Sequence, residues 1–311
     1  MRFLILGAGA LGGYFGGMLR RGGAEVGFLV RPRRAAQLRE QGLVVTLPDG
    51  EYRSPVKALL SGEIDGPYDI VLLACKAYDL DGAMDAVAPA LGAASAVLPI
   101  LNGINHIETL VARFGQERVL GGLGMVNGEL SLEGVVAMRV LTPSHISFGE
   151  LNGERSNRCL EVQRAFAAGG VPSTVSDHIL ADMWGKFCGF GAIAVIHTLM
   201  RARAGEIAAT AAGAGLVDAA IDECAQVAAA EGYPPTSAPG EFARSLYTRA
   251  DSAYRPSILV DLAAGRPTEG EHTIGDLVRR ADRHGLAVPL LRAALCNLQI
   301  HEAGLRRPRA S

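Results

Sequence analysis

Three glycines near the N-terminus have a spacing that indicates a phosphate-binding loop. They form the pattern G-x-G-x-x-G, with an apolar run over residues 3–6 before it and an apolar segment of helical length after it. Such a strand–loop–helix turn lets a pyrophosphate approach the backbone at a helix N-terminus. A glycine-rich turn that binds nothing is the alternative, but a second apolar run over 25–30 favours dinucleotide binding. The predicted cofactor-binding residues of the loop are Gly7, Ala8, Gly9, Ala10, Leu11 and Gly12.

The residue that follows the second predicted strand indicates which dinucleotide is bound. A carboxylate at this place would accept hydrogen bonds from the adenosine ribose of NAD. The strand over 25–30 is followed instead by Arg31, and no acid appears until Glu40. A guanidinium donates to phosphate oxygens bidentately, so Arg31 favours the 2′-phosphate of NADP as cofactor. For Arg34 a plainer interpretation stays open, a solvated residue at the start of a basic helix.

Two more polar positions follow predicted buried strands. Lys76 comes after an apolar run over 69–75, and Asn102-Gly103 follows a strand predicted over 96–101. Ligands of doubly wound sheets bind beyond the carboxyl ends of the strands, so these residues should share an edge with the glycine loop. A solvated lysine and an ordinary Asn-Gly turn are the alternatives. The shared edge favours roles for Lys76 and Asn102 at the cofactor site.

The remaining patterns predict the elements that position these residues. In the N-terminal part we expect helices over 33–41, from 79 to about 91, and over 155–168. Strands are expected over 43–47, 51–54, 119–126 and 171–175, with hairpin strands over 135–149 that extend the sheet. From 177 the pattern is almost entirely helical, over 177–200, 205–231, 241–250 and 271–301 with a break at 285–289. The predicted fold class is α/β, with a Rossmann-type NADP-binding domain over 1–176 and an all-helical substrate and catalytic domain over 177–311.

Composition narrows the function classes. The 30 basic residues nearly balance the 32 acidic ones, and no long block of like charge suggests a nucleic acid or an anionic membrane as partner. The five cysteines are dispersed, which argues against a disulfide framework and against a metal site. The N-terminus leads directly into a strand, and the most apolar stretch, 187–200, is shorter than a membrane span. We expect a cytoplasmic protein; the sequence leaves the oligomeric state open, a homodimer included.

Lys186 stands out in the helical half, within Asp182-Met-Trp-Gly-Lys186-Phe-Cys-Gly-Phe190. A lysine among apolar and aromatic neighbours loses hydration, which lowers its pKa toward the range useful for proton donation. From the local sequence alone, a lysine that extends its ammonium to water is the better interpretation.

Several separated motifs, taken together and in order, resemble the ketopantoate reductases (2-dehydropantoate 2-reductases). The resemblance spans nearly the whole chain and implies an NADP-binding Rossmann domain, an all-helical domain, and an active site in the cleft between them. The motifs are Gly7-Ala-Gly-Ala-Leu-Gly12, Arg31, Lys76-Ala77, Asn102-Gly103, Trp184-x-Lys186, Ser257 and Pro267-Thr268-Glu269.

The resemblance also implies a role for each of these residues. Lys186 would be the general acid, and Glu269 would complete a polar network around it and the substrate. Asn102 would lie near the nicotinamide and the substrate, Ser257 would contact the substrate carboxylate, and Lys76 would line the cleft near the cofactor. The implied reaction is NADPH-dependent reduction of a 2-oxo acid, by default ketopantoate to pantoate in pantothenate biosynthesis.

The chain departs from the family pattern near the predicted general acid. Asparagines expected one and two helical turns after Lys186 are replaced by Phe190 and Ala194, and further family asparagines fall near Ala204 and at Tyr254. Phenylalanine and alanine cannot donate hydrogen bonds from their side chains, so the pocket should be less polar. This favours, as an alternative, a related reductase for a more apolar 2-oxo acid.

Two further interpretations stay open. A non-catalytic NADP-binding sensor would need only the glycine loop and Arg31, so the retention of Lys186, Ser257 and Glu269 argues against it. His197 lies eleven residues after Lys186, three helical turns along and roughly 16 Å away in an unbroken helix. We interpret His197 as a packed or interface histidine.

Overall fold

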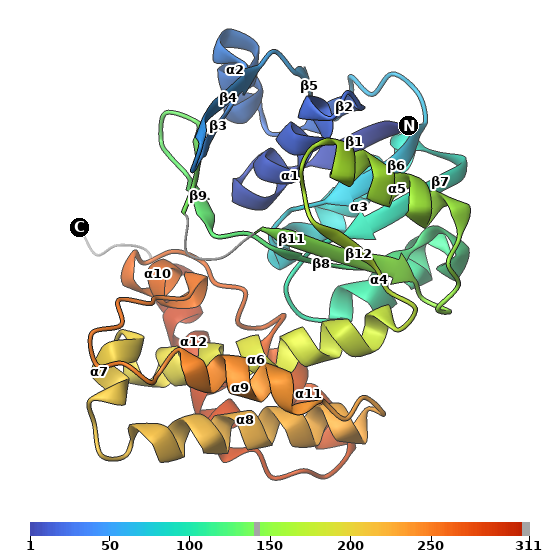
Figure 1. The fold of residues 1–311 in the computed structure, drawn as a ribbon. Helices are drawn as coiled ribbons and strands as arrows, with labels where there is room; N and C mark the ends of the chain where they lie inside the picture. Colours follow the sequence, from blue (N-terminus) through green and yellow to red (C-terminus); the bar gives the residue numbers. More distant parts are fainter. Residues whose placement is uncertain (140–143, 307–311) are drawn as a thin grey trace. The chain divides into compact units, whose positions relative to one another are not determined.

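The computed structural model describes residues 1–139 and 144–306 (Figure 1). The chain divides into two compact units. The first comprises Met1–Leu101 and His106–Leu180, and the second comprises Asn102–Asn105 and Ala181–Ser311.

A five-stranded parallel sheet forms the centre of the first unit, in the order β5-β2-β1-β6-β7. The first strand of the chain is central, and the chain crosses to one side through β2 and to the other through β6. This reversal of direction beside β1 is the place where doubly wound sheets bind ligands. The strands are β1 (Arg2–Leu6), β2 (Glu25–Leu29), β5 (Lys57–Leu59), β6 (Tyr68–Leu73) and β7 (Leu91–Pro99).

Alternate side chains of these strands pack on α1 (Ala10–Arg21). Phe3, Ile5 and Phe28 belong to one fully buried cluster with Phe15 of α1. Phe15 in turn contacts Phe166 of α5 (Asn157–Ala168) edge-on, at 5.8 Å between ring centroids. The other helices of this unit are α2 (Pro32–Gln41), α3 (Leu80–Val87) and α4 (Asn105–Phe114), with short 3-10 turns η1 (Ala77–Asp79), η2 (Ala88–Ala90) and η3 (Gln116–Arg118).

The later strands of this unit correct one prediction, because they do not extend the central sheet as a hairpin. They form two further sheets, ordered β4-β3-β10-β9 and β12-β11-β8. Val136 of β10 packs on Gly13 of α1, where an added Cβ would lie 2.6 Å from its Cγ2, so the apolar face of α1 holds β10 beside β3. The strands are β3 (Leu43–Leu47), β4 (Gly50–Ser54), β8 (Leu120–Met125), β9 (Gly128–Leu130), β10 (Val135–Met138), β11 (His145–Glu150) and β12 (Ser173–Val175). Residues 140–143 of the predicted hairpin lie outside the described residues.

Other boundaries also differ from the predictions. The strand expected over 96–101 runs over Leu91–Pro99, because its first residues are small and half exposed and give no apolar signal. The sequence interpretation missed the three-residue strands β5 and β9 and the ten-residue helix α4. Most other predicted strands and helices of this unit are confirmed within two or three residues.

The second unit is built from helices. Two predicted helices need correction: the one over 205–231 is broken, and the one over 241–250 lies earlier. At Gly213 an added Cβ would lie 2.2 Å from Ile207 O, a close approach that belongs to the turn separating α7 from α8. A short helix, α10, was not predicted. The helices are α6 (Ile179–Met200), α7 (Ala204–Ala208), α8 (Gly213–Ala230), α9 (Ser237–Ser245), α10 (Ser257–Ala263), α11 (Ile274–Arg283) and α12 (Pro289–Arg306).

Helix α6 is the helix that carries Lys186, and small residues let its neighbours approach it closely. An added Cβ on Gly189 would lie 3.0 Å from the carbonyl of Pro239 in α9. One on Gly191 would lie 3.1 Å from Leu277 of α11 and 3.4 Å from Cys224 of α8. The alanine-rich α8 is therefore a close-packed core helix, as predicted.

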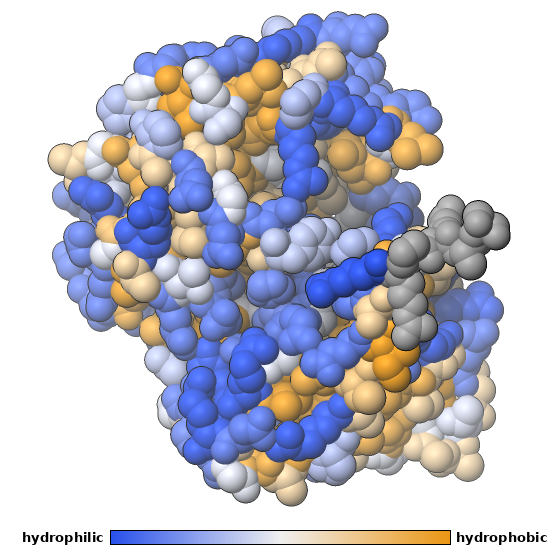
Figure 2. All heavy atoms as spheres, turned by 180° about the vertical axis from the view of Figure 1, so that it is seen from behind, coloured by the Kyte–Doolittle hydropathy of each residue, from blue (hydrophilic) through white to orange (hydrophobic). Residues whose placement is uncertain are grey.

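Helix α6 also corrects the membrane argument made from the sequence. It is 22 residues long and its most apolar window of 18 residues has a mean hydropathy of 1.5, so by length and composition it could cross a membrane. Of its most apolar window, 61% is buried within the protein, which is typical of a core helix. Length alone therefore does not separate the two cases here. Figure 2 shows one face of the molecule, on which hydrophilic and hydrophobic residues are interspersed.

Candidate active site

The glycine loop has the geometry that a bound pyrophosphate requires. Gly7 has a φ of +93°, and its N–H donates to Leu29 O at 3.0 Å. An added Cβ on Gly12 would lie 2.0 Å from Gly7 O, so only glycine fits between loop and helix. An added Cβ on Gly9 would meet no atom within 4 Å, so the backbone there is open to a ligand. Helix α1 begins directly afterwards with no acidic residue in its first turn, which suits an anion.

The segments that follow the central strands leave the sheet at one edge. Ala74 N donates to Leu6 O at 3.0 Å, and Ile100 N donates to Leu73 O at 3.0 Å. Parallel pairing thus continues past the ends of β1 and β6. Lys76 follows two residues after Ala74, and it is half-buried at the start of η1. The structure therefore brings Lys76 to the same edge as the glycine loop.

Arg31 lies at this edge too, after β2. Its side chain is 79% exposed, and Nη2 forms an ion pair with Asp79 Oδ1 at 2.8 Å. Asp79 follows β6, and β1 lies between β2 and β6, so the pair spans the end of the strand that leads into the glycine loop. An exposed guanidinium here fits a phosphate on the adenosine side of a dinucleotide.

Arg34 corrects the interpretation as a solvated residue. Its guanidinium is half-buried, and Nε donates to Ala8 O at 3.1 Å while Nη1 donates to Gly134 O at 2.9 Å. Burial lowers the pKa of this arginine. The sequence interpretation missed both contacts, because Ala8 and Gly134 lie 26 and 100 residues away from Arg34 in the sequence.

Asn102 is exposed, and Asn102–Asn105 belongs to the second unit. Gly103 has a φ of +86°, and an added Cβ would lie 3.0 Å from His272 O. The glycine of the Asn-Gly pair is thus required both by its conformation and by a close backbone approach.

Lys186 is half-buried on α6, and Trp184 and Phe187 beside it are buried. Its Nζ lies 5.5 Å from the centroid of the Phe190 ring, which itself packs on Phe242 at 5.7 Å. Burial lowers the pKa of Lys186 to about 8, while the negative charge of Glu269 opposes that shift. These surroundings favour the interpretation of Lys186 as a desolvated lysine over that of a lysine that reaches into water.

Glu269 is half-buried in the turn between α10 and α11, and its charge acts on Lys186. The turn is firmly held: Glu269 O accepts from His272 N and Thr273 N at 3.1 Å each, and Thr268 Oγ1 donates to Glu302 at 3.0 Å. Helix α11 begins only at Ile274, so Glu269 does not lie in its first turn. The charge of Glu269 therefore acts on the ammonium group of Lys186. Ser257, the other predicted residue of this region, is the exposed first residue of α10.

His197 is fully buried at the end of α6. Its Nδ1 is 2.7 Å from Ala202 O, and its ring packs on Tyr247 and Tyr254 with centroids 5.7 and 6.1 Å apart. Burial lowers its pKa, which favours the neutral ring. Helix α6 is continuous from Lys186 to His197, so His197 is a packed histidine several turns from the lysine.

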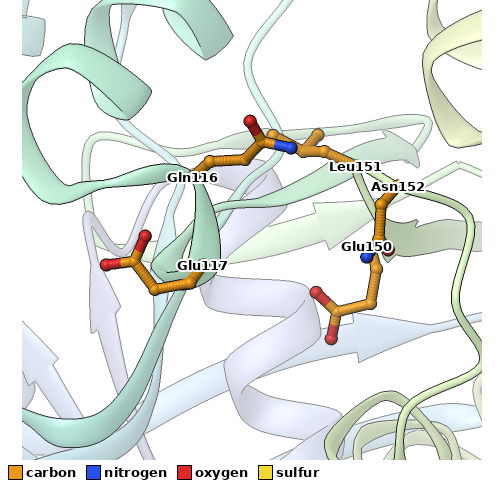
Figure 3. Close-up of a pocket in the computed structure, with 5 residues that line it drawn as sticks. All are labelled: Gln116, Glu117, Glu150, Leu151 and Asn152. Atoms are coloured by element: carbon orange, nitrogen blue, oxygen red, sulfur yellow. The ribbon is translucent and has the colours of Figure 1, made fainter.

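A small pocket of about 250 Å³ lies elsewhere in the first unit (Figure 3). It is lined by η3 and by the end of β11, and no predicted site residue is among its residues. Its buried carboxylate, Glu150, is already held by Arg158 and by Ser156 at 2.6 Å each. That carboxylate is therefore satisfied within the protein. The lining residues are Gln116, Glu117, Glu150, Leu151 and Asn152.

Comparison with known proteins defines the class of this fold and site. The family model described as Ketopantoate reductase PanE/ApbA matches residues 3–153, and its C-terminal counterpart matches residues 178–302. The chain belongs to the ketopantoate reductase family.

Individual relatives agree with this assignment. The chain is 38% identical over 304 residues to "Uncharacterized oxidoreductase YkpB" of Bacillus subtilis (strain 168), covering 97% of this chain and 99% of the relative. It is 29% identical over 294 residues to a 2-dehydropantoate 2-reductase of Halobacterium salinarum, covering 94% and 96%. A solved PanE/ApbA family ketopantoate reductase from Ralstonia eutropha JMP134 superposes with a TM-score of 0.89 at 26% identity, covering 99% and 100%. A D-mandelate dehydrogenase complex with NADH shares the fold, with a TM-score of 0.89 at 23% identity, covering 99% and 100%.

These findings confirm the predicted family, the α/β fold class with its Rossmann-type and helical parts, and the enzyme class. The protein is an oxidoreductase that acts on CH–OH groups, and its reaction class is the reduction of a 2-oxo acid. The glycine loop described above fits a dinucleotide cofactor.

Proposed function

We propose that this enzyme uses NADPH to reduce a 2-oxo acid to a 2-hydroxy acid, with Lys186 as the general acid. The observation that carries the proposal is the state of Lys186. Burial lowers its pKa to about 8, and the charge of Glu269 acts in the opposite direction and favours the ammonium form. A general acid works best when its pKa lies near the working pH, so this lysine suits the task.

The chemistry follows from the charge that the reaction creates. The nicotinamide, when bound, supplies a hydride to the carbonyl carbon of the substrate. Negative charge then develops on the carbonyl oxygen, and the ammonium of Lys186 stabilises it and donates a proton to it. Lys186 is left as a neutral amine and recovers its proton from solvent. Glu269 favours the charged form of Lys186 and so restores the acid for the next turnover.

The choice of NADPH rests on Arg31. Its exposed guanidinium lies after β2, where an enzyme specific for NAD would carry a carboxylate. In the same proposal the loop over residues 7–12 and Lys76 hold the dinucleotide, Asn102 contacts cofactor and substrate, and Ser257 binds the substrate carboxylate.

Ketopantoate is the default substrate of this proposal, since family members bear that name. A more apolar 2-oxo acid is the second candidate, and one observation favours it. Phe190 replaces an expected asparagine, and its ring lies beside the Lys186 ammonium and packs on Phe242. A substrate hydroxyl left without a partner in such surroundings loses roughly 1–3 kcal/mol of binding free energy.

One assay separates the two candidates. NADPH oxidation is followed with ketopantoate and with branched and aromatic 2-oxo acids that lack the hydroxyl. A kcat/KM at least tenfold higher for ketopantoate would support the default and contradict the apolar pocket. The reverse ratio would support the apolar substrate. No turnover of any 2-oxo acid would refute the proposed reaction.

The proposal also covers the location, the partners and the oligomeric state of the enzyme. We place it in the cytoplasm, acting on a small molecule without nucleic acid or membrane, as a homodimer. We assign cofactor binding to residues 1–176 and substrate binding with catalysis to residues 177–311. Light scattering on the purified protein tests the dimer.

A further inference from the structure

One face of α2 holds the turn between β9 and β10. Residues 34, 37 and 41 of α2 lie on the same side of the helix, and their side chains donate to three successive backbone carbonyls of the turn. The turn is closed by its own hydrogen bond from Gly134 N to Ser131 O at 3.1 Å. The three bonds are Arg34 Nη1 to Gly134 O at 2.9 Å, Gln37 Nε2 to Leu132 O at 3.0 Å and Gln41 Nε2 to Glu133 O at 2.6 Å.

Among these three residues, Arg34 also contacts the glycine loop. Its Nε donates to Ala8 O at 3.1 Å, so one guanidinium joins the 131–134 turn to the cofactor loop. Space for this junction depends on Gly134, where an added Cβ would lie 2.6 Å from Arg34 Nη1. Gly134 also has a φ of +91°, a conformation that favours glycine.

The bond to Ala8 O has a consequence for the next peptide group. In a trans peptide the carbonyl and the following N–H point in opposite directions. A carbonyl of Ala8 directed at Arg34 therefore turns the N–H of Gly9 away from Arg34. Gly9 is the N-cap of α1, and an added Cβ there would meet no atom within 4 Å. The open side of the loop is where a phosphate would approach.

Arg34 differs in this respect from Arg31. The Nη2 atom of Arg34 is buried and has no hydrogen-bond partner, so the group is enclosed by the protein. The Arg31 side chain is 79% exposed and available to a ligand. The 2′-phosphate distinguishes NADP from NAD, whereas the pyrophosphate is common to both. The exposed Arg31 therefore suits the 2′-phosphate. The enclosed Arg34 suits the loop that holds the pyrophosphate.

We propose that Arg34 is a positioning residue for the dinucleotide loop. It orients the Ala8–Gly9 peptide toward the pyrophosphate, using the 131–134 turn as its second anchor. This role rests on the proposed dinucleotide site and deepens it. It applies to NADPH and NADH alike, because the pyrophosphate is the same in both.

The test is an equilibrium titration that measures the Kd of NADPH and of NADH for the unchanged protein, Arg34→Met and Arg34→Lys. Methionine retains the apolar stem but donates nothing, so both Kd values should rise roughly tenfold with their ratio unchanged. Lysine keeps a charged donor but lacks the planar fork whose separate nitrogens reach the two carbonyls, so it should recover part of the loss. Arg33→Met is the control for a lost charge, because Arg33 is exposed on the same helix, and both Kd values should stay unchanged.

A second variant separates the loop from the turn. Gln41→Ala removes a bond to the same turn and leaves the hydrogen bonds of Arg34 intact, so cofactor binding should change much less than in Arg34→Met. Equal weakening in both variants would overturn the proposal, because the effect would then come from the turn. Unchanged Kd values in Arg34→Met would overturn it as well. A rise in the Kd of NADPH alone would also overturn the proposal, since it would assign Arg34 to the 2′-phosphate. If the unchanged protein binds neither dinucleotide, the proposed cofactor fails first, and this role fails with it.

Discussion

The two units of the protein place positive charge in opposite ways. In the first unit, Arg31 is exposed at a strand end and pairs with a carboxylate. In the second, Lys186 is half-buried on a core helix, and burial lowers its pKa to about 8. Arginine keeps its proton at any physiological pH, whereas a desolvated lysine can release it. A permanent charge suits recognition of a phosphate, and a removable proton suits catalysis.

The most direct test of this difference is to give Lys186 a permanent charge. Lys186→Arg retains the positive charge but cannot release a proton, and Lys186→Ala removes both. We expect kcat to fall in both variants by roughly 10²–10⁴-fold, the usual contribution of a general acid. The measurement is steady-state NADPH oxidation with the best 2-oxo acid.

The Kd of NADPH serves as the check that these variants are folded, and it should be nearly unchanged. Activity close to normal in Lys186→Arg would show that a positive charge suffices for turnover without a removable proton. Lys186 and Arg31 would then not differ in the way proposed here.

The opposite test concerns the permanent charge. Arg31→Ala should raise the Kd of NADPH by roughly tenfold or more, because a charge-assisted bidentate contact with the 2′-phosphate is lost. The Kd of NADH should change little. Equal losses for both cofactors would contradict the assignment of Arg31 to the 2′-phosphate.

The removable proton should also be visible in the pH dependence. The acid form of Lys186 is needed for reduction, so kcat/KM should fall as the pH rises through about 8, the pKa of Lys186. Oxidation of the 2-hydroxy acid needs the neutral amine and should rise over the same range. Glu269 raises this pKa, so Glu269→Gln should move both transitions to lower pH. An unchanged profile in Glu269→Gln would mean that another group titrates.

The contrast between the units also explains what could be predicted from the sequence. The glycine loop could be predicted because strand, loop and helix adjoin within about twenty residues, and Gly12 packs directly against Gly7 O within the same loop. The burial of Arg34 depends on Gly134, one hundred residues away. The pKa of Lys186 depends on its burial in the helical unit and on Glu269, which only the family resemblance brought near it. The pairing of β10 with β3 depends on how α1 packs. Long-range packing decided each of these features, and no local pattern reports it.

The smallest expected effect concerns Asp79, the partner of Arg31. Surface ion pairs contribute at most about 1 kcal/mol, so Asp79→Asn should lower the Kd of NADPH by no more than about fivefold. The gain has two sources to distinguish: release of the guanidinium, and removal of a negative charge near the 2′-phosphate. Adding Asp79→Asn to Arg31→Ala separates them. If Asp79 competes for the guanidinium, the gain disappears in that background; if it repels the phosphate directly, the gain persists. Weaker NADPH binding in Asp79→Asn alone would mean that the carboxylate holds Arg31 in its binding position. The exposed arginine would then be organised by its neighbours, as Lys186 is.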